Sequence, residues 1–167
     1  MISASPAKRT APDLKSRAVA RAPVADAIDS VTLDYQGRFL RRKTLTTDAG
    51  ARLFVDLAET VSLDDGDAFV TTGGETIRIV AAPEALLEIT ARGGQLARLC
   101  WHIGNRHTPA QIESDRILIQ SDKVMADMLA KLDANLRPIV ARFTPERGAS
   151  GHGRTHGHHH GPAEDGD

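Results

Sequence analysis

The sequence is poor in several residues that carry common kinds of chemistry. Its 167 residues include one cysteine, Cys100, and aromatic residues make up 4% of the chain. A single thiol cannot form an internal disulfide or a Cys-x-x-Cys metal site, and it favours a reducing compartment. Few aromatics, with lysines and arginines spread along the chain rather than along one element, argue against a nucleic-acid-binding protein.

Long apolar runs are also missing from the first thirty residues, where basic residues alternate with alanines and prolines. No run there is long enough for a signal peptide or a membrane span, so we expect no membrane partner. The simplest interpretation is a cytoplasmic protein with a disordered N-terminal extension over residues 1–28. An organelle transit peptide, which is also rich in arginine, is the alternative.

Histidine, by contrast, is concentrated at one end of the chain. Five of the seven histidines lie within nine positions of a glycine-rich stretch: His152, His156, His158, His159 and His160. This composition cannot build a core, but several neutral imidazoles on a flexible chain can converge on nickel, copper or zinc. We expect a flexible tail over residues 146–167. A purification tag and a solubilising tail that meets no metal are the alternatives.

Residues 29–82 have the pattern of a small all-β domain. Short strand-like runs are broken by turn residues every eight to twelve positions or so, as in Asp48-Ala49-Gly50 and Gly73-Gly74. Leu53, Val55 and Leu57 alternate with more polar neighbours. The spacing predicts a β-sandwich or small barrel of about six strands.

The pattern changes after residues 81–84, and a second domain is expected over residues 83–145. Its apolar spacing predicts a strand, a helix, a hairpin at 111–119, a helix capped by Asp122, and a last strand that Pro138 places at an edge. The order βαββαβ is that of ferredoxin-like folds. The predicted fold class is therefore α+β, with a β domain, a ferredoxin-like domain and a histidine-rich tail.

His107 is the histidine that the first predicted helix singles out. It lies four residues after Ile103 and shares the apolar stripe if the helix continues, although Gly104 and Pro109 place it where the helix stops. A histidine satisfied within the core is the alternative. A two-fold dimer could bring two copies of His107 together in an open, exchangeable metal site. His102 lies about 140° around the helix and remains a secondary candidate.

The stretch from Trp101 to Pro109, WHIGNRHTP, closely resembles the signature of the UreE family of urease accessory proteins, which are nickel metallochaperones. Further segments resemble the same family in the same order: RFLRRKTLTTDAG (38–50), AAPEALLEI (81–89) and FTPERGA (143–149). The resemblance implies an N-terminal β domain similar to a peptide-binding domain and a ferredoxin-like domain that binds metal and dimerises.

The resemblance also implies a function. In that family the histidine of Gly-Asn-Arg-His, here His107, is the metal ligand at the interface of a homodimer, and the tail histidines bind or pass on further ions. The implied cargo is Ni²⁺, although Zn²⁺ or Cu²⁺ can bind similar ligands. The implied partners are the GTPase accessory protein UreG and the urease apoprotein complex, and the chain itself catalyses no reaction. Ser121 and Lys123 stand where some members have additional histidines, so we expect no secondary site there.

Other interpretations of the same residues remain open. A general zinc- or copper-binding or storage protein would use the same histidines. A metal-dependent hydrolase would need fixed ligands and a carboxylate base, but His-Glu-x-x-His is absent. The basic cluster Arg38, Arg41, Arg42 and Lys43 is either a solvated strand face or a contact for an acidic partner.

Overall fold

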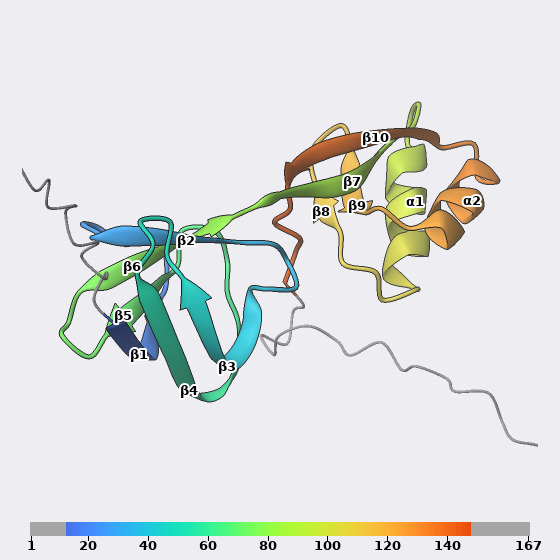
Figure 1. Ribbon diagram of the computed structural model, residues 1–167. Coiled ribbons are helices and arrows are strands. Elements are labelled where there is room, and N and C mark those ends of the chain that lie inside the picture. Colours follow the sequence, from blue (N-terminus) through green and yellow to red (C-terminus); the bar gives the residue numbers. More distant parts are fainter. Residues whose placement is uncertain (1–12, 148–167) are drawn as a thin grey trace, which may run out of the picture. The chain divides into compact units, whose positions relative to one another are not determined.

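The computed structural model describes residues 13–147, and the chain divides into two compact units (Figure 1). Of the described residues, one unit holds 13–85 together with Val140–Thr144, and the other holds Leu86–Ile139 and residues 145–147. The first is built of strands and the second contains both helices, so the predicted α+β class is confirmed. Within residues 13–147, no helix is long and apolar enough to cross a membrane.

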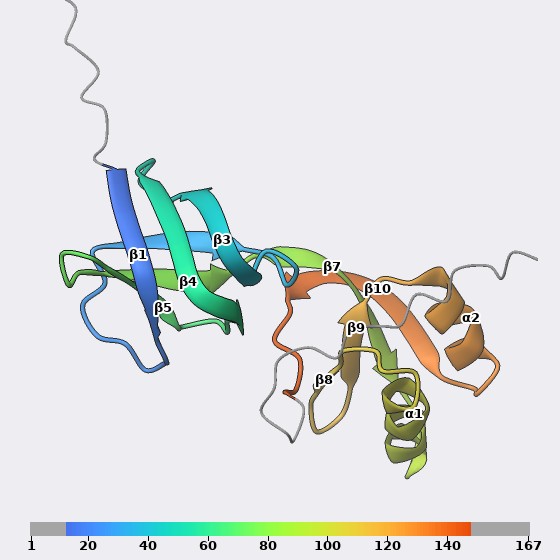
Figure 2. The same ribbon diagram turned by 90° about the horizontal axis from the view of Figure 1, so that it is seen from below.

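Six strands form the N-terminal unit, and all of them belong to one sheet. They are β1 (Asp13–Ala20), β2 (Asp29–Leu33), β3 (Phe39–Thr46), β4 (Arg52–Ser62), β5 (Ala68–Thr71) and β6 (Thr76–Ala81). The sheet order is β2-β6-β5-β1-β4-β3, with β1 parallel to β4 and β2 parallel to β6. The sheet folds across itself, so that β1, β4 and β3 cross β2, β5 and β6 (Figure 2).

The core of this unit lies inside the folded sheet. Leu53, Val55 and Leu57 of β4 are at most 4% exposed, which confirms the predicted alternation. They pack with Phe69 of β5 and Ile77 of β6, among others. Inward apolar residues therefore come from every part of the sheet, because period-two alternation turns one face of each strand toward the core.

Strand β1 corrects one prediction. Residues 13–20 fall in the stretch that was expected to be a disordered extension, and they form a strand between β5 and β4. Leu14 and Ser16 lie opposite the buried Leu53 and Val55 of β4. The pairing joins residues about forty positions apart. A strand with so distant a partner could not be predicted from the local sequence pattern.

A second correction concerns Arg38, which was grouped with an exposed basic cluster. Its side chain is 1% exposed and donates to the backbone carbonyls of Leu63 and Phe143. The guanidinium also lies over the ring of Tyr35, 5.7 Å from its centroid. Arg38 therefore ties the returning segment at Phe143 to this unit, whereas Arg41, Arg42 and Lys43 are exposed.

The second unit has the predicted βαββαβ order. Its elements are β7 (Pro83–Thr90), α1 (Gln95–Gly104), β8 (Gln111–Ile112), β9 (Ile117–Gln120), α2 (Lys123–Ala130) and β10 (Asn135–Arg142). The sheet order β10-β7-β9-β8 confirms the hairpin of β8 and β9 and places β10 at an edge. Apolar residues of β7 and β9 pack against Leu99 and Ile103 of α1 and Met125 and Leu129 of α2. Both helices therefore cover one face of the sheet.

Candidate metal site

Helix α1 ends in a specific hydrogen-bonded turn that carries His107. The N–H of His107 donates to the carbonyl of Gly104 at 2.9 Å, and the N–H of Thr108 donates to that of Ile103 at 3.4 Å. These two bonds form a Schellman motif, in which the residue after the cap adopts a left-handed conformation. That residue is His107, with φ of 56°.

The turn decides where the imidazole of His107 lies. Because α1 ends at Gly104, His107 does not continue the apolar stripe of Leu99 and Ile103, as Gly104 and Pro109 led us to expect. The side chain is exposed, as expected for a position where the helix stops. Glycine usually occupies such a position, since a side chain costs free energy in the left-handed region. An imidazole is thus held at the surface by a turn that glycine would fit better.

The other histidine of the described residues lies in α1 itself. His102 is half-buried, and its ring meets the ring of Trp101 edge to face at a centroid separation of 5.0 Å. Trp101 is 64% exposed despite its apolar surface. The helix end therefore presents a large aromatic side chain and two histidines, one of them partly covered.

A groove lies beside this turn, and sequence reasoning missed it. Its volume is about 460 Å³, and its lining is Arg106, Val124, Asp127, Met128 and Lys131. Val124 is 69% exposed, an unusual degree for an aliphatic side chain in a helix that packs on a core.

The turn is also tied to α2. The hydroxyl of Thr108 lies 3.7 Å from the sulfur of Met125, toward which it donates. Met125 is 7% exposed and belongs to the core. His107 is therefore flanked on its C-terminal side by a residue that is anchored to the packed interior.

The potential metal ligands are not gathered within one copy of the described chain. Among residues 13–147, no three histidine, cysteine, aspartate or glutamate side chains lie together in a way that could hold an ion. Cys100 is half-buried and lies against the core. The predicted ligands His152, His156, His158, His159 and His160 lie outside the described residues.

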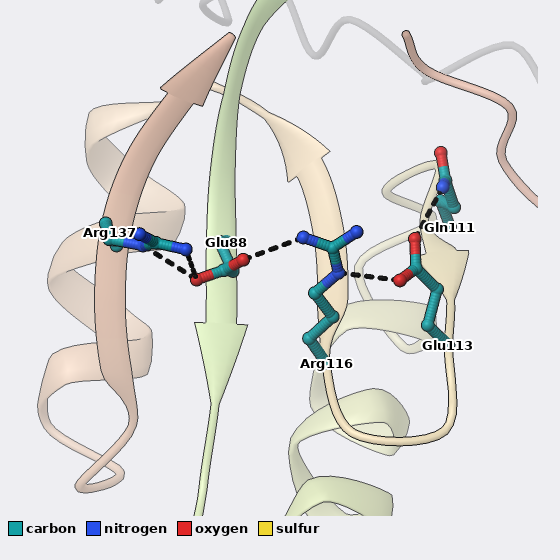
Figure 3. A network of polar contacts seen from close by, with 5 residues as sticks. All are labelled: Glu88, Gln111, Glu113, Arg116 and Arg137. Carbon is teal, nitrogen blue, oxygen red and sulfur yellow. Dashed lines mark hydrogen bonds and ion pairs between the residues drawn. The ribbon is translucent and has the colours of Figure 1, made fainter. Parts of the chain in front are cut away.

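A network of charged residues crosses the sheet of the second unit (Figure 3). Glu88 of β7 accepts from Arg116 at 2.9 Å and from Arg137 of β10 at 2.9 Å. Arg116 also donates to Glu113 at 2.6 Å, and Gln111 donates to the same carboxylate at 2.8 Å. The network joins β10, β7 and the β8–β9 hairpin through side chains.

The arginines change the acidity of both carboxyl groups. Hydrogen bonds from Arg116 and Arg137 hold the pKa of Glu88 below the ordinary value of 4.5. A hydrogen bond from Arg116 likewise lowers the pKa of Glu113. Both carboxylates are therefore ionised at neutral pH and are fully bonded, so this network serves to hold the sheet together.

Comparison with known proteins assigns the chain to a family. A family model described as "UreE urease accessory protein, N-terminal domain" matches residues 12–82, and one described as "UreE urease accessory protein, C-terminal domain" matches residues 84–166. A urease accessory protein UreE of Ruegeria pomeroyi is 57% identical over 136 residues, which cover 81% of this chain and 90% of the relative. The corresponding protein of Cereibacter sphaeroides is 51% identical over 138 residues, covering 83% and 74%. The chain with the exposed Gly-Asn-Arg-His turn therefore belongs to the UreE family of urease accessory proteins.

Proposed function

We propose that this chain is a nickel metallochaperone that holds Ni²⁺ between two copies of His107 across a homodimer. The observation that carries the proposal is the Schellman turn of α1, which holds His107 exposed in a left-handed conformation. Membership of a family of urease accessory proteins supports urease as the destination. The ion is the cargo of the protein and takes part in no reaction catalysed by it.

The proposal requires a second copy because one imidazole binds an ion weakly. In a two-fold dimer, a residue near the axis meets its own copy, so one exposed His107 supplies two ligands. Water or tail histidines would complete the coordination sphere and leave the site open for exchange. Exposed Trp101 and Val124, on α1 and α2, give the second copy apolar surface to cover.

The tail histidines are the auxiliary part of the proposal. His152, His156, His158, His159 and His160 collect ions or help to pass them to and from the His107 site. The GTPase accessory protein UreG and the urease apoprotein complex are the proposed recipients. His102 is not given a role as a ligand, because its ring is partly covered and meets that of Trp101.

Titration calorimetry with Ni²⁺ tests this assignment when it is combined with mass determination. We expect the full chain to bind more ions than a chain truncated at Ser150, and both to keep one tight site per dimer. His107→Ala should remove that site, whereas His102→Ala, a matched control five residues earlier on α1, should keep it. Loss of the tight site in the truncated chain, with retention in His107→Ala, would contradict the assignment.

The alternative functions predict different results in the same titration. A general zinc- or copper-binding or storage protein would use the same histidines but would hold most of its ions in the tail, so truncation would remove most of its capacity. A hydrolase would need a carboxylate base beside fixed ligands, and the described residues bring no such group of ligands together. Neither alternative explains why the histidine of the family motif occupies an exposed left-handed turn.

A further inference from the structure

The groove beside the His107 turn has one wall formed by a stripe of α2 and its C-cap. Four lining residues share the i, i+3, i+4, i+7 spacing that places side chains on one side of a helix: Val124, Asp127, Met128 and Lys131. Apolar Val124 and basic Lys131 are seven residues apart, or about 10 Å along the helix. The α2 wall therefore runs from an apolar end, which a second copy can cover, to a basic end.

The charged residues of the groove leave an excess of positive charge. Arg106 and Lys131 are exposed, and the ion pairs within residues 13–147 include neither of them. Asp127 is the acidic residue of the described lining, and it already pairs with Lys123 at 3.1 Å. The groove thus offers two cations to carboxylates that come from outside the described part of the chain.

The chain leaves the described part of the second unit close to this groove. The N–H of Glu146 donates to the carbonyl of Ala110 at 2.9 Å. Ala110 comes four residues after Arg106, so the Cα atoms of these two residues are at most about 15 Å apart. The twenty residues that follow Arg147 therefore start from a point near the groove and near the His107 turn.

Those twenty residues contain three acidic side chains beyond the histidines: Glu164, Asp165 and Asp167. Glu164 is seventeen positions after Arg147, and a glycine-rich stretch of that length spans roughly 20–25 Å on average. This span exceeds the distance of at most about 15 Å between the Cα atoms of Ala110 and Arg106. The acidic side chains can therefore reach the groove, at an effective concentration on the order of millimolar.

We propose that the acidic segment 164–167 binds the groove of its own chain, with its carboxylates on Arg106 and Lys131. Exposed ion pairs are individually weak, but the tether supplies the effective concentration that makes such weak contacts sufficient. His158, His159 and His160 precede the segment by four to six residues, so the bound segment holds them beside the His107 turn. This consequence for the ion rests on the proposed nickel site, whereas the binding of the segment needs no metal.

Paramagnetic relaxation enhancement tests the binding on the full metal-free chain. A nitroxide at Ala163→Cys, in a Cys100→Ser background, should broaden the backbone amide resonances of residues 124–131. The broadening should fall severalfold at about 0.5 M salt, because screening weakens exposed ion pairs. The groove variant Arg106→Glu, Lys131→Glu should reduce it roughly fivefold. Arg98→Glu, which reverses an exposed charge of α1 outside the groove lining, should leave it unchanged.

A change in the tail tests the same contact without altering the folded unit. The neutral-tail variant Glu164→Gln, Asp165→Asn, Asp167→Asn should lose the broadening as the groove variant does. Glu164→Lys with Asp165→Lys, added to the groove variant, should restore it because the charges are exchanged. With nickel bound, the neutral-tail variant should release the ion to a chelator roughly threefold faster than the natural chain.

Several outcomes would overturn the proposal. Equal broadening in the neutral-tail variant would mean that the acidic side chains do not place the segment. Broadening of isotope-enriched chains by separate spin-labelled chains would assign the segment to the groove of a second copy. Loss of self-association in the groove variant, without broadening in the parent chain, would assign the groove itself to a second copy.

The nickel measurement keeps this proposal distinct from the proposed function. Equal nickel release by the natural and neutral-tail chains would overturn the placement of the tail histidines beside His107. Failure of His107 to bind nickel would instead contradict the proposed function, and the broadening in the metal-free chain would still decide whether the segment binds the groove.

Discussion

At the scale of single residues, His107 combines a potential ligand with an unfavourable backbone conformation. Its φ of 56° lies where glycine is preferred, and the surrounding turn holds it there through two backbone bonds. Such strain persists when the neighbouring structure fixes it, and it is common at functional sites. The exposed imidazole fits a residue retained for binding rather than for stability.

The substitution His107→Gly separates these two roles. Glycine adopts the left-handed conformation without a clash, although it loses more entropy on folding. We therefore expect the free energy of unfolding to rise by about 0.5–1 kcal/mol, measured by denaturation in urea without metal. Nickel binding at the turn should be lost at the same time.

The matched control is His107→Ala, which removes the imidazole but keeps a β-carbon. Its stability should lie below that of His107→Gly, because alanine retains the cost of the left-handed conformation. If glycine and alanine at this position give equal stabilities, His107 is not strained in solution as the turn indicates.

Glu88 is a single residue that makes the stability of the second unit depend on pH. Because Arg116 and Arg137 lower its pKa below 4.5 in the folded state, folding favours the ionised form. The stability that Glu88 provides is therefore present above pH 4.5 and is lost as the pH falls through its lowered value. We expect the free energy of unfolding to decrease on acidification in that range.

Glu88→Gln tests this dependence, since glutamine cannot ionise. The variant should be less stable at neutral pH, and its stability should change less with pH below 4.5, measured by denaturation at a series of pH values. Arg137→Gln, which removes one donor and leaves Glu88 ionisable, should give an intermediate slope. An unchanged slope in Glu88→Gln would show that the network does not control acid stability.

At the scale of secondary-structure elements, the N-terminus of α2 is capped by the side chain of Asp122. The N–H of Met125 donates to the carboxylate of Asp122 at 2.7 Å, as the sequence predicted for a capped helix. Loss of this bond leaves one N–H of the first turn without its partner. Asp122→Ala should therefore cost about 1 kcal/mol of stability, measured by denaturation in urea.

Asp127→Ala provides the control on the same helix. Asp127 pairs with Lys123 at 3.1 Å, but both side chains are largely exposed. Such a pair contributes at most about 0.5 kcal/mol. An Asp127→Ala cost equal to that of Asp122→Ala would contradict the importance of the cap.

Elements with local signals could be predicted from the sequence. The second unit follows the expected βαββαβ order, because helix spacing, the Asp122 cap and the hairpin turn lie within short stretches. Strand β1 could not be predicted in this way, since its partner β4 is distant in the chain and Lys15 and Arg17 make it look disordered.

The candidate site, too, was predicted from the sequence only in part. A motif of successive residues singled out His107, and the break at Gly104 indicated an exposed position. The left-handed turn was not foreseen, because the Schellman bonds depend on the exact residue at which α1 ends. Burial of Arg38 was missed because its acceptors, Leu63 and Phe143, lie 25 and 105 positions away.

At the scale of the whole molecule, the proposed metal site lies on one of the two compact units. The second unit presents His107 in the turn after α1, beside the groove that Val124 lines, and we assign this surface to a second copy and its shared ion. The described residues of the first unit contain no histidine.

The central claim is that two chains share one ion through His107. Native mass spectrometry of a chain ending at Arg147, titrated with Ni²⁺, tests it most directly because the tail histidines are absent. We predict one Ni²⁺ per two chains for this protein and for its His102→Ala variant, and none for His107→Ala. One Ni²⁺ per single chain, or an unchanged complex in His107→Ala, would contradict the claim.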